Sequence, residues 1–125
     1  MNVIDSSLWL EYLAGNLGDS AVINLVEDTA NQYVPSICIY EVFKWMLGQK
    51  NEAAARASVS FMQKNAVVIN LTPEIAVLAA KFSRELGLPL ADSIIYATAK
   101  IKGATIYTKD RHFENLDGAH YFAKP

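Results

Sequence analysis

The chain has 125 residues, of which 52% are hydrophobic and 19% are charged, enough apolar material for one compact domain over residues 1–125 and too much for a disordered chain. Its single cysteine, Cys38, excludes an internal disulfide, and without any CxxC or Cys/His cluster a structural zinc site is not expected. No segment approaches the roughly 18–20 apolar residues of a membrane span, and the N-terminus lacks the pattern of a signal peptide, so we expect a cytoplasmic protein.

The formal net charge of −2 is unevenly distributed along the chain. Residues 1–43 contain six acids and no Lys or Arg, whereas residues 44–125 contain all 11 basic residues against seven acids and carry a net charge of +4. A polyanionic partner such as RNA would therefore have to bind a local basic face, because the global charge does not attract it.

The first half of the chain is expected to alternate short apolar strands with helices. In chain order these elements are a strand at 2–4, a helix ending near Gly15, a helix starting at Asp19 or Ser20, a strand at 32–35 and an apolar helix at about 36–48. Asp5, Ser6 and Ser7 all offer N-cap chemistry to the first helix, and we expect Ser7 to be its cap.

The second half continues the same alternation. Its expected elements are a helix at 51–65, a strand at 67–70, a helix between Thr72 and Gly87, a helix at about 91–102, and strands at 104–107 and 119–122. Thr72 and Pro73 give an N-cap followed by a first-turn proline, and Gly87 gives a helix end. Short apolar strands that alternate with helices predict an α/β domain with three layers, α/β/α, around a mostly parallel sheet of four or five strands.

Four acids deserve a functional interpretation because parallel sheets bind ligands outside the carboxyl ends of their strands. Asp5 ends the first strand, Asp110 follows the strand at 104–107, Asp92 lies near the start of the helix at 91–102, and Glu41 interrupts the apolar helix at 36–48. Each also has a structural interpretation. Asp5 and Asp92 are suitable helix caps or first-turn acids, Asp110 suits a turn, and Glu41 is spaced to pair with Lys44.

A shared metal site explains all four acids at once. Converging carboxylates repel one another, and a hard divalent ion such as Mg²⁺ or Mn²⁺ removes that conflict. A metal held in this way can activate water and orient a phosphodiester. The two histidines, His112 and His120, lie together in the last segment, which argues against a metal-free ribonuclease with a histidine acid and base, and we expect His112 in a loop near the site. There is no GxGxxG or P-loop motif for a nucleotide.

Four segments together resemble a known family. IDSS at 4–7, YEV at 40–42, LADSIIYATA at 90–99 and YTKDRHF at 107–113 are similar, in the same order, to the motifs of PIN-domain ribonucleases, and most closely to VapC-type toxins of toxin–antitoxin pairs. The resemblance spans nearly the whole chain, and the ordered set is more specific than any one motif.

The resemblance implies a function and a set of site residues. Asp5, Glu41, Asp92 and Asp110 match the family's acidic metal-binding quartet, and Ser6 and Thr108 match hydroxyl residues that support it, Ser6 through the Asp5 carboxylate. The family consists of Mg²⁺- or Mn²⁺-dependent endoribonucleases, usually homodimers inhibited by a cognate antitoxin whose tail fills the cleft. Alternatives within the resemblance are a PIN-type nuclease that acts in RNA processing or on DNA, and an inactive protein- or RNA-binding module.

Two surfaces are candidates for partners. Lys109 and Arg111 flank Asp110 and are the leading candidates for RNA phosphate contacts. Further basic candidates are Lys44, Lys50, Lys81 and Arg84. The apolar residues of the first helix have two interpretations, a groove for an amphipathic antitoxin segment or a fully internal helix pair; they are Leu8, Trp9, Tyr12 and Leu13.

Overall fold

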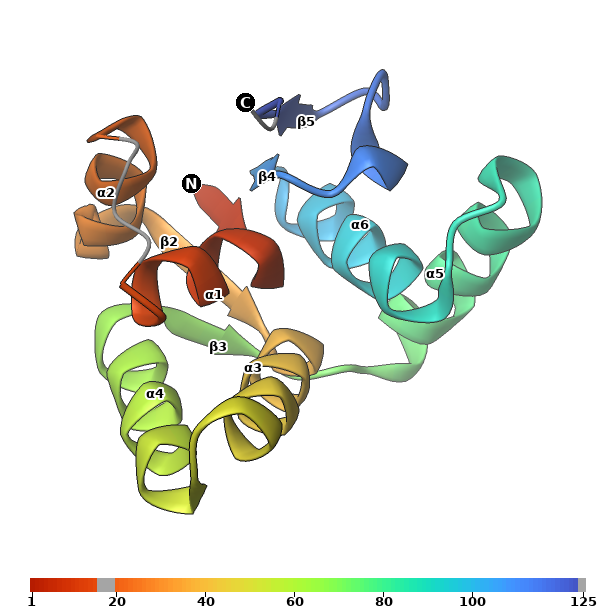
Figure 1. Cartoon of the computed structure of the whole chain (residues 1–125). Helices are drawn as coiled ribbons and strands as arrows, with labels where there is room; N and C mark the ends of the chain where they lie inside the picture. Colours follow the sequence, from red (N-terminus) through yellow and green to blue (C-terminus); the bar gives the residue numbers. More distant parts are fainter. Residues whose placement is uncertain (16–19, 124–125) are drawn as a thin grey trace.

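The computed structural model describes residues 1–15 and 20–123, and its centre is a five-stranded sheet with helices on both sides (Figure 1). The strands are β1 (Asn2–Ile4), β2 (Gln32–Pro35), β3 (Val67–Ile69), β4 (Thr105–Thr108) and β5 (Ala119–Tyr121). They lie in the order β3-β2-β1-β4-β5, and every neighbouring pair is parallel.

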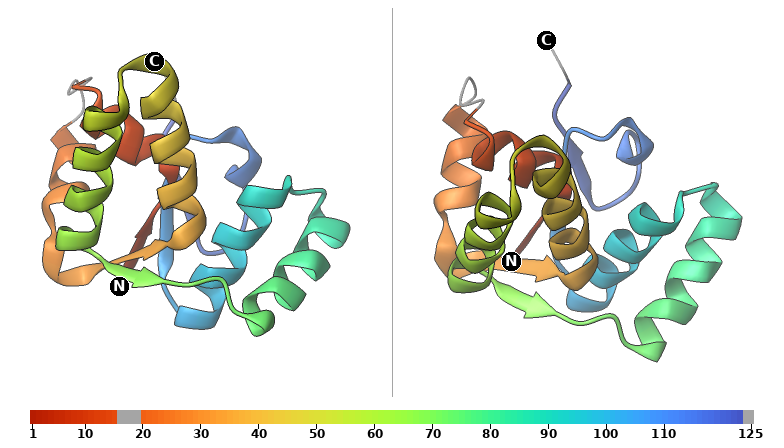
Figure 2. Two further views of the ribbon diagram at one scale, coloured as in Figure 1. Left: turned by 90° about the horizontal axis from the view of Figure 1, so that it is seen from below. Right: turned by 60° about the horizontal axis from the view of Figure 1, so that its bottom comes forward.

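Helices cover both faces of this sheet. They are α1 (Ser6–Leu13), α2 (Ser20–Glu27), α3 (Ser36–Gln49), α4 (Glu52–Asn65), α5 (Pro73–Leu86) and α6 (Leu90–Lys102), with two 3₁₀ turns at Thr29–Asn31 and Arg111–Phe113. Helices α1 to α4 lie on one face and α5 and α6 on the other, as the views in Figures 1 and 2 show. Crossover connections between parallel strands are right-handed. Because the chain moves outward from β1 to β3 and then crosses back to β4, the helices before β3 and the helices after it must cover opposite faces of the sheet. The predicted three-layer α/β/α fold is confirmed.

Most helix ends agree with the sequence signals. Thr72 Oγ1 accepts a hydrogen bond from the Ile75 N–H at 3.2 Å, and Gly87 ends α5 with φ 70°, both as expected. The cap of α1 differs from the prediction. Asp5 holds the extended N-cap position, and its carboxylate accepts a bond from the Ser7 N–H, so the expectation that Ser7 is the cap is wrong. The alternative start of α2 at Asp19 falls outside the described residues.

The fourth strand begins one residue later than predicted. Ala104, its expected first residue, donates its N–H to the Ala99 carbonyl at 2.9 Å and so completes the end of α6 after Gly103, which has φ 62°. Thr105 then pairs with Asn2 on β1. Strands β3 and β5 each end one residue earlier than expected, at Ile69 and Tyr121.

Helix α1 is packed on several sides. Leu8 and Trp9 have no exposed surface, because α1 contacts α2, α3 and β4 together. Tyr12 stacks on Phe61 with ring centroids 5.7 Å apart. The internal-helix interpretation is therefore correct for Leu8 and Trp9, and neither can line a groove. Among the described helices, none combines the length and the apolar character needed to cross a bilayer.

Candidate active site

The candidate site lies where two neighbouring strands send the chain in opposite directions. From β1 the chain crosses toward β2, and from β4 it continues toward β5 on the other side, so the carboxyl ends of β1 and β4 form a topological switch point. Asp5 directly follows β1, and Asp110 follows β4 after one intervening residue. A cleft of about 790 Å³ opens there, and its walls come from α1, α3 and the start of α6.

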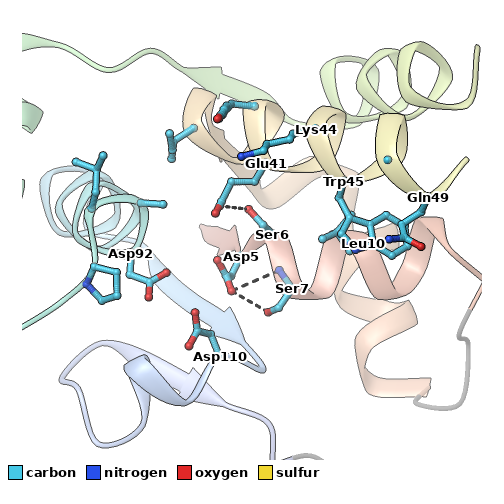
Figure 3. Close-up of a pocket in the computed structure, with 16 residues that line it drawn as sticks. Asp5, Ser6, Ser7, Leu10, Glu41, Lys44, Trp45, Gln49, Asp92 and Asp110 are labelled. Atoms are coloured by element: carbon cyan, nitrogen blue, oxygen red, sulfur yellow. Dashed lines mark hydrogen bonds between the residues drawn. The ribbon is translucent and has the colours of Figure 1, made fainter. Parts of the chain in front are cut away.

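All four predicted acids line this cleft, which we call the acidic cleft (Figure 3). Glu41 reaches it from α3 and Asp92 from the first turn of α6, while Asp5 and Asp110 come from the strand ends. Asp5 is 3% exposed and Asp92 7% exposed, so both carboxylates are largely removed from water. Residues that are up to 105 positions apart in the sequence thus share one cavity.

Two hydroxyl groups hold the Asp5 carboxylate. Ser7 Oγ donates to Asp5 Oδ2 at 2.7 Å, and Thr108 Oγ1 donates to the same oxygen at 2.8 Å. Thr108 Oγ1 also accepts the N–H of Asp110 at 2.9 Å, so this fully buried residue links the acids that follow β1 and β4.

Ser6 has a different partner from the one expected. Its Oγ donates to Glu41 Oε1 at 2.7 Å, so it orients the acid on α3 and not Asp5. Ser7 takes the position expected for Ser6. Successive residues in the first turn of a helix point about 100° apart, which sends Ser6 toward α3 and Ser7 toward β4.

Burial makes these carboxylates unfavourable as isolated anions. Burial is the main cause that raises the pKa of Asp5 and of Glu41 above their usual values. The pKa of Asp92 rises to about 7, first through burial and then through the negative charges of Asp110 and Asp5, with His112 opposing the rise. A divalent cation would remove this penalty, and the carboxylate oxygens are the donors that Mg²⁺ and Mn²⁺ prefer. The residues present therefore fit such an ion.

Lys44 and Lys109 differ in whether they pair with an acid. Within residues 1–15 and 20–123, Glu41 forms no ion pair with Lys44, whose ammonium lies 5.7 Å from the ring centroid of Tyr40. Lys109 does have an acidic partner. Its Nζ lies 2.8 Å from the Glu11 carboxylate, and the two side chains are 12% and 18% exposed. The charge of Lys109 is already compensated, whereas Arg111 is exposed.

Two further features of the cleft were not predicted as site residues. His112 Nδ1 lies 3.0 Å from Asp92 Oδ2 and 2.9 Å from Asp110 Oδ1. The sequence suggested that His112 lies near the site, and the structure shows it in direct contact with two of the acids. Trp45 and Gln49 line the cleft beside Glu41 on α3. The spacing of Glu41, Trp45 and Gln49, every fourth residue, is the signal that would have placed all three on one helix face.

Comparisons with known families and solved structures identify the family and the fold of this chain. The family model for the PIN domain matches residues 3–119. This chain is a member of the PIN domain family. No curated protein sequence matches it.

Solved structures similar to this PIN domain include a toxin–antitoxin complex and several VapBC or VapC proteins. A toxin–antitoxin complex from Klebsiella pneumoniae is 21% identical with a TM-score of 0.76, covering 96% of each chain. DNA-bound VapBC from Salmonella typhimurium is 16% identical with a TM-score of 0.79, covering 97% of this chain and 96% of that one. VapC20 from Mycobacterium tuberculosis, described as a sarcin-ricin loop cleaving toxin, is 16% identical with a TM-score of 0.75, covering 94% and 96%. At these identities the likeness establishes the fold.

Replacing Thr108 with valine in this PIN domain tests the link between its strand-end acids. The variant removes a buried donor to Asp5 and leaves the part-buried Asp110 N–H without its acceptor, which we expect to lower the free energy of unfolding by about 1–3 kcal/mol. Loss of a group that orients metal-binding acids typically lowers metal affinity or activity by about 10- to 100-fold. Urea denaturation and nuclease rates measure the two effects.

The matched control is Thr98→Val. Thr98 is also buried, and its hydroxyl donates to the Ile94 carbonyl within the same helix, α6. It should leave nuclease activity unchanged. Equal activity losses in the two variants would mean that Thr108 acts through general stability and not through the acids.

Proposed function

We propose that this PIN domain is a Mg²⁺- or Mn²⁺-dependent endoribonuclease that hydrolyses RNA phosphodiester bonds and acts as the toxin of a VapBC-type pair. The observation that carries the proposal is the convergence of Asp5, Glu41, Asp92 and Asp110 in one cleft at the switch point of the sheet. The raised pKa values of three of these acids support it, because they indicate carboxylates arranged to receive a cation.

The chain's own residues would have distinct roles at the metal site. The four carboxylates would hold the ion, Ser7 and Thr108 would fix the Asp5 carboxylate, and Ser6 would fix Glu41. When bound, Mg²⁺ or Mn²⁺ supplies an activated water and neutralises charge on the phosphodiester. The walls of the cleft would align the RNA backbone beside the acids.

One wall of the cleft has the chemistry of a nucleotide-binding surface. This surface, the α3 wall, consists of Tyr40, Lys44, Trp45 and Gln49. Tyr40 is 51% and Trp45 37% exposed, so both rings can accept a stacked base, and Lys44 can accompany a phosphate. In Figure 3, Trp45 and Gln49 lie farther along the cleft than Glu41, on the side away from Asp92 and Asp110. Single-stranded RNA, with its unstacked bases, suits this wall better than a duplex does.

Trp45→Ala is expected to weaken RNA binding by about tenfold, because stacking on an aromatic ring contributes about 1–3 kcal/mol per base. Binding is measured on single-stranded RNA with the Asp92→Asn change present, so that the RNA is not cut. Trp45→Phe should retain most of the affinity. Trp9 is fully buried, so quenching of tryptophan fluorescence by RNA would report on Trp45. Unchanged affinity in Trp45→Ala would remove the α3 wall from the proposal.

Arg111→Ala tests the electrostatic part of RNA binding. Removing one phosphate contact should weaken binding to RNA of any sequence. It should also lower by about 1 the salt slope, which is the slope of the logarithm of the binding constant against the logarithm of salt concentration, while Trp45→Ala should leave this slope unchanged. Because Lys109 is paired with Glu11, we propose Arg111 and not Lys109 as the phosphate contact here. Unaltered binding and salt slope in Arg111→Ala would contradict this assignment.

The experiment that tests the function incubates the protein with mixed RNA and Mg²⁺ or Mn²⁺, with and without EDTA, beside Asp92→Asn. We expect cutting that requires metal and is lost in the variant. Cutting that survives both EDTA and Asp92→Asn would contradict the proposed chemistry, and parallel incubation with DNA distinguishes a ribonuclease from a DNA nuclease. Binding of RNA without cutting would instead favour a binding module.

The toxin assignment is supported by the similar structures, of which one is described as a toxin–antitoxin complex, one as a sarcin-ricin loop cleaving toxin, and others as VapBC. We propose a cognate antitoxin as partner and a homodimer as the assembled state. The acid-rich residues 1–43 favour an antitoxin segment that carries basic residues. Expression should arrest growth, and Asp5→Asn should relieve the arrest. Arrest that persists in Asp5→Asn would argue against nuclease toxicity.

A further inference from the structure

His112 is held in the acidic cleft by the backbone around it. Asp110 caps the 3₁₀ turn at Arg111–Phe113, and its Oδ1 accepts the His112 N–H at 2.9 Å. Phe113, the next residue, is fully buried and fixes the turn against the core. The imidazole therefore projects over the cleft from an anchored position, with 57% of its side chain still exposed.

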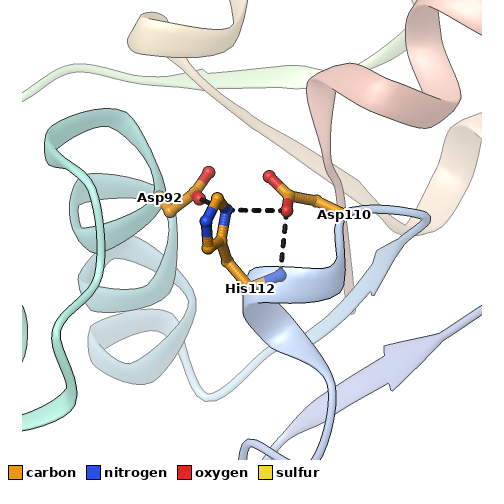
Figure 4. Close-up of side chains that lie close together, drawn as sticks. All are labelled: Asp92, Asp110 and His112. Atoms are coloured by element: carbon orange, nitrogen blue, oxygen red, sulfur yellow. Dashed lines mark hydrogen bonds and ion pairs between the residues drawn. The ribbon is translucent and has the colours of Figure 1, made fainter.

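The ring nitrogen and two carboxylate oxygens form a compact triangle (Figure 4). Nδ1 of His112 lies 3.0 Å from Asp92 Oδ2 and 2.9 Å from Asp110 Oδ1, and one atom from each residue lies within 4.8 Å of the others. In an octahedral site with ligands at about 2.1 Å, neighbouring ligand atoms are about 3.0 Å apart. The distances from Nδ1 to both oxygens match that spacing, so Nδ1 can be a neighbouring ligand to each of the two oxygens in an octahedral site.

We propose that His112 Nδ1 is a ligand of the divalent ion in this cleft and that it favours Mn²⁺ over Mg²⁺. This inference rests on the proposed function, since it concerns the same metal. Carboxylates serve both ions, whereas imidazole binds transition metals and has little affinity for Mg²⁺. A nitrogen donor among oxygen donors therefore raises the affinity of the site for Mn²⁺ selectively.

The other histidine provides a matched control. His120 lies on β5, where its ring packs against Tyr107 and Phe122 with centroids 5.3 and 4.6 Å away. His112, by contrast, contacts the carboxylates of Asp92 and Asp110. His112→Gln and His120→Gln thus make the same chemical change at a position inside the site and at one outside it.

Pulsed EPR of bound Mn²⁺ tests the ligand directly, because it detects hyperfine coupling to an imidazole nitrogen without any catalytic turnover. We expect this coupling in the wild-type protein and in His120→Gln, and its loss in His112→Gln. Calorimetric titration should show Mn²⁺ affinity lowered at least about tenfold in His112→Gln, because loss of a residue that only supports a metal ligand already lowers affinity by about 10- to 100-fold, with Mg²⁺ affinity nearly unchanged.

Two different failures are distinguishable. If wild-type protein binds Mn²⁺ without nitrogen coupling, the ligand inference is wrong and the proposed nuclease site stands. If the wild-type protein binds neither Mn²⁺ nor Mg²⁺ at millimolar concentration, the proposed function fails together with the inference. The wild-type spectrum decides the first case even if His112→Gln folds poorly.

Discussion

Asp92→Asn is expected to lower RNA cleavage by about 100- to 1,000-fold, the scale of effect seen when a group that stabilises a transition state is removed. Asp92 lies in the first turn of α6, is 7% exposed, and contacts the Asp110 and His112 side of the acidic cleft. Asparagine keeps the shape of the side chain but removes the charge that would hold a divalent ion. Cleavage of a labelled RNA under saturating Mn²⁺ measures the loss.

Asp117→Asn is the matched control for this change. Asp117 is exposed and pairs with Lys100 on the surface at 2.9 Å. It makes the same chemical substitution outside the cleft and should leave the cleavage rate within about twofold, since surface changes of this kind have small effects. An Asp92→Asn protein that cleaves within tenfold of wild type would show that this carboxylate is not needed for the chemistry.

The metal-free protein is expected to lose stability as the pH rises, and Asp92→Asn should suppress much of that loss. The pKa of Asp92 is about 7 in the folded protein, against 3.8 for an ordinary aspartate side chain. The folded state therefore holds a proton that the unfolded state releases above pH 3.8. The stabilisation from that proton is complete below this value and is lost as the pH rises through about 7. Between pH 5 and 8 the loss should be about 2 kcal/mol.

Urea denaturation in EDTA at pH 5 and pH 8 measures this effect. The difference in the free energy of unfolding between Asp92→Asn and wild type should grow in favour of the variant by about 2 kcal/mol from pH 5 to pH 8. Adding Mn²⁺ at pH 8 should restore wild type and have little effect on the variant. A difference that does not depend on pH would mean that the Asp92 carboxyl ionises normally.

Much of the fold was predictable from local signals. The Thr72, Pro73 and Gly87 signals bracket α5 as expected, and the apolar run at 2–4 ends at Asp5 as a strand end should. The approach of Asp5 and Asp110 was also predictable, because a parallel sheet brings the carboxyl ends of its strands to one edge. Glu41 and Asp92 lie on helices, and the metal interpretation and the family resemblance assigned them to the same site. These features depend on residues close in sequence or on the general geometry of the fold.

What could not be predicted depends on contacts between distant residues. The ion pair of Lys109 with Glu11 joins residues 98 positions apart, and it compensates the charge of a lysine that the sequence suggested as an RNA contact beside Asp110. The burial of Leu8 and Trp9 required knowing that α1 is covered by α2, α3 and β4 together. The sequence identifies apolar residues but does not count the elements that cover them.

The exchange of roles between Ser6 and Ser7 has a similar cause. Both residues follow Asp5, and the resemblance assigned support of that acid to Ser6. The choice depends on where α1 starts and how it is rotated against β4 and α3, which decides that Ser7 Oγ meets Asp5 and Ser6 Oγ meets Glu41. A single residue of offset at a helix start changes which neighbour a hydroxyl reaches.

The most direct test of a metal-dependent ribonuclease site follows bound Mn²⁺ and RNA cleavage in the same samples. The protein is stripped with EDTA, Mn²⁺ is titrated back, and EPR and cleavage of one labelled single-stranded RNA are recorded at each step. Cleavage should be absent in the stripped protein and should rise in proportion to bound Mn²⁺, with no rise in Asp92→Asn. Cleavage by the stripped protein at the rate of the loaded protein would contradict the assignment of the acidic cleft as the catalytic metal site.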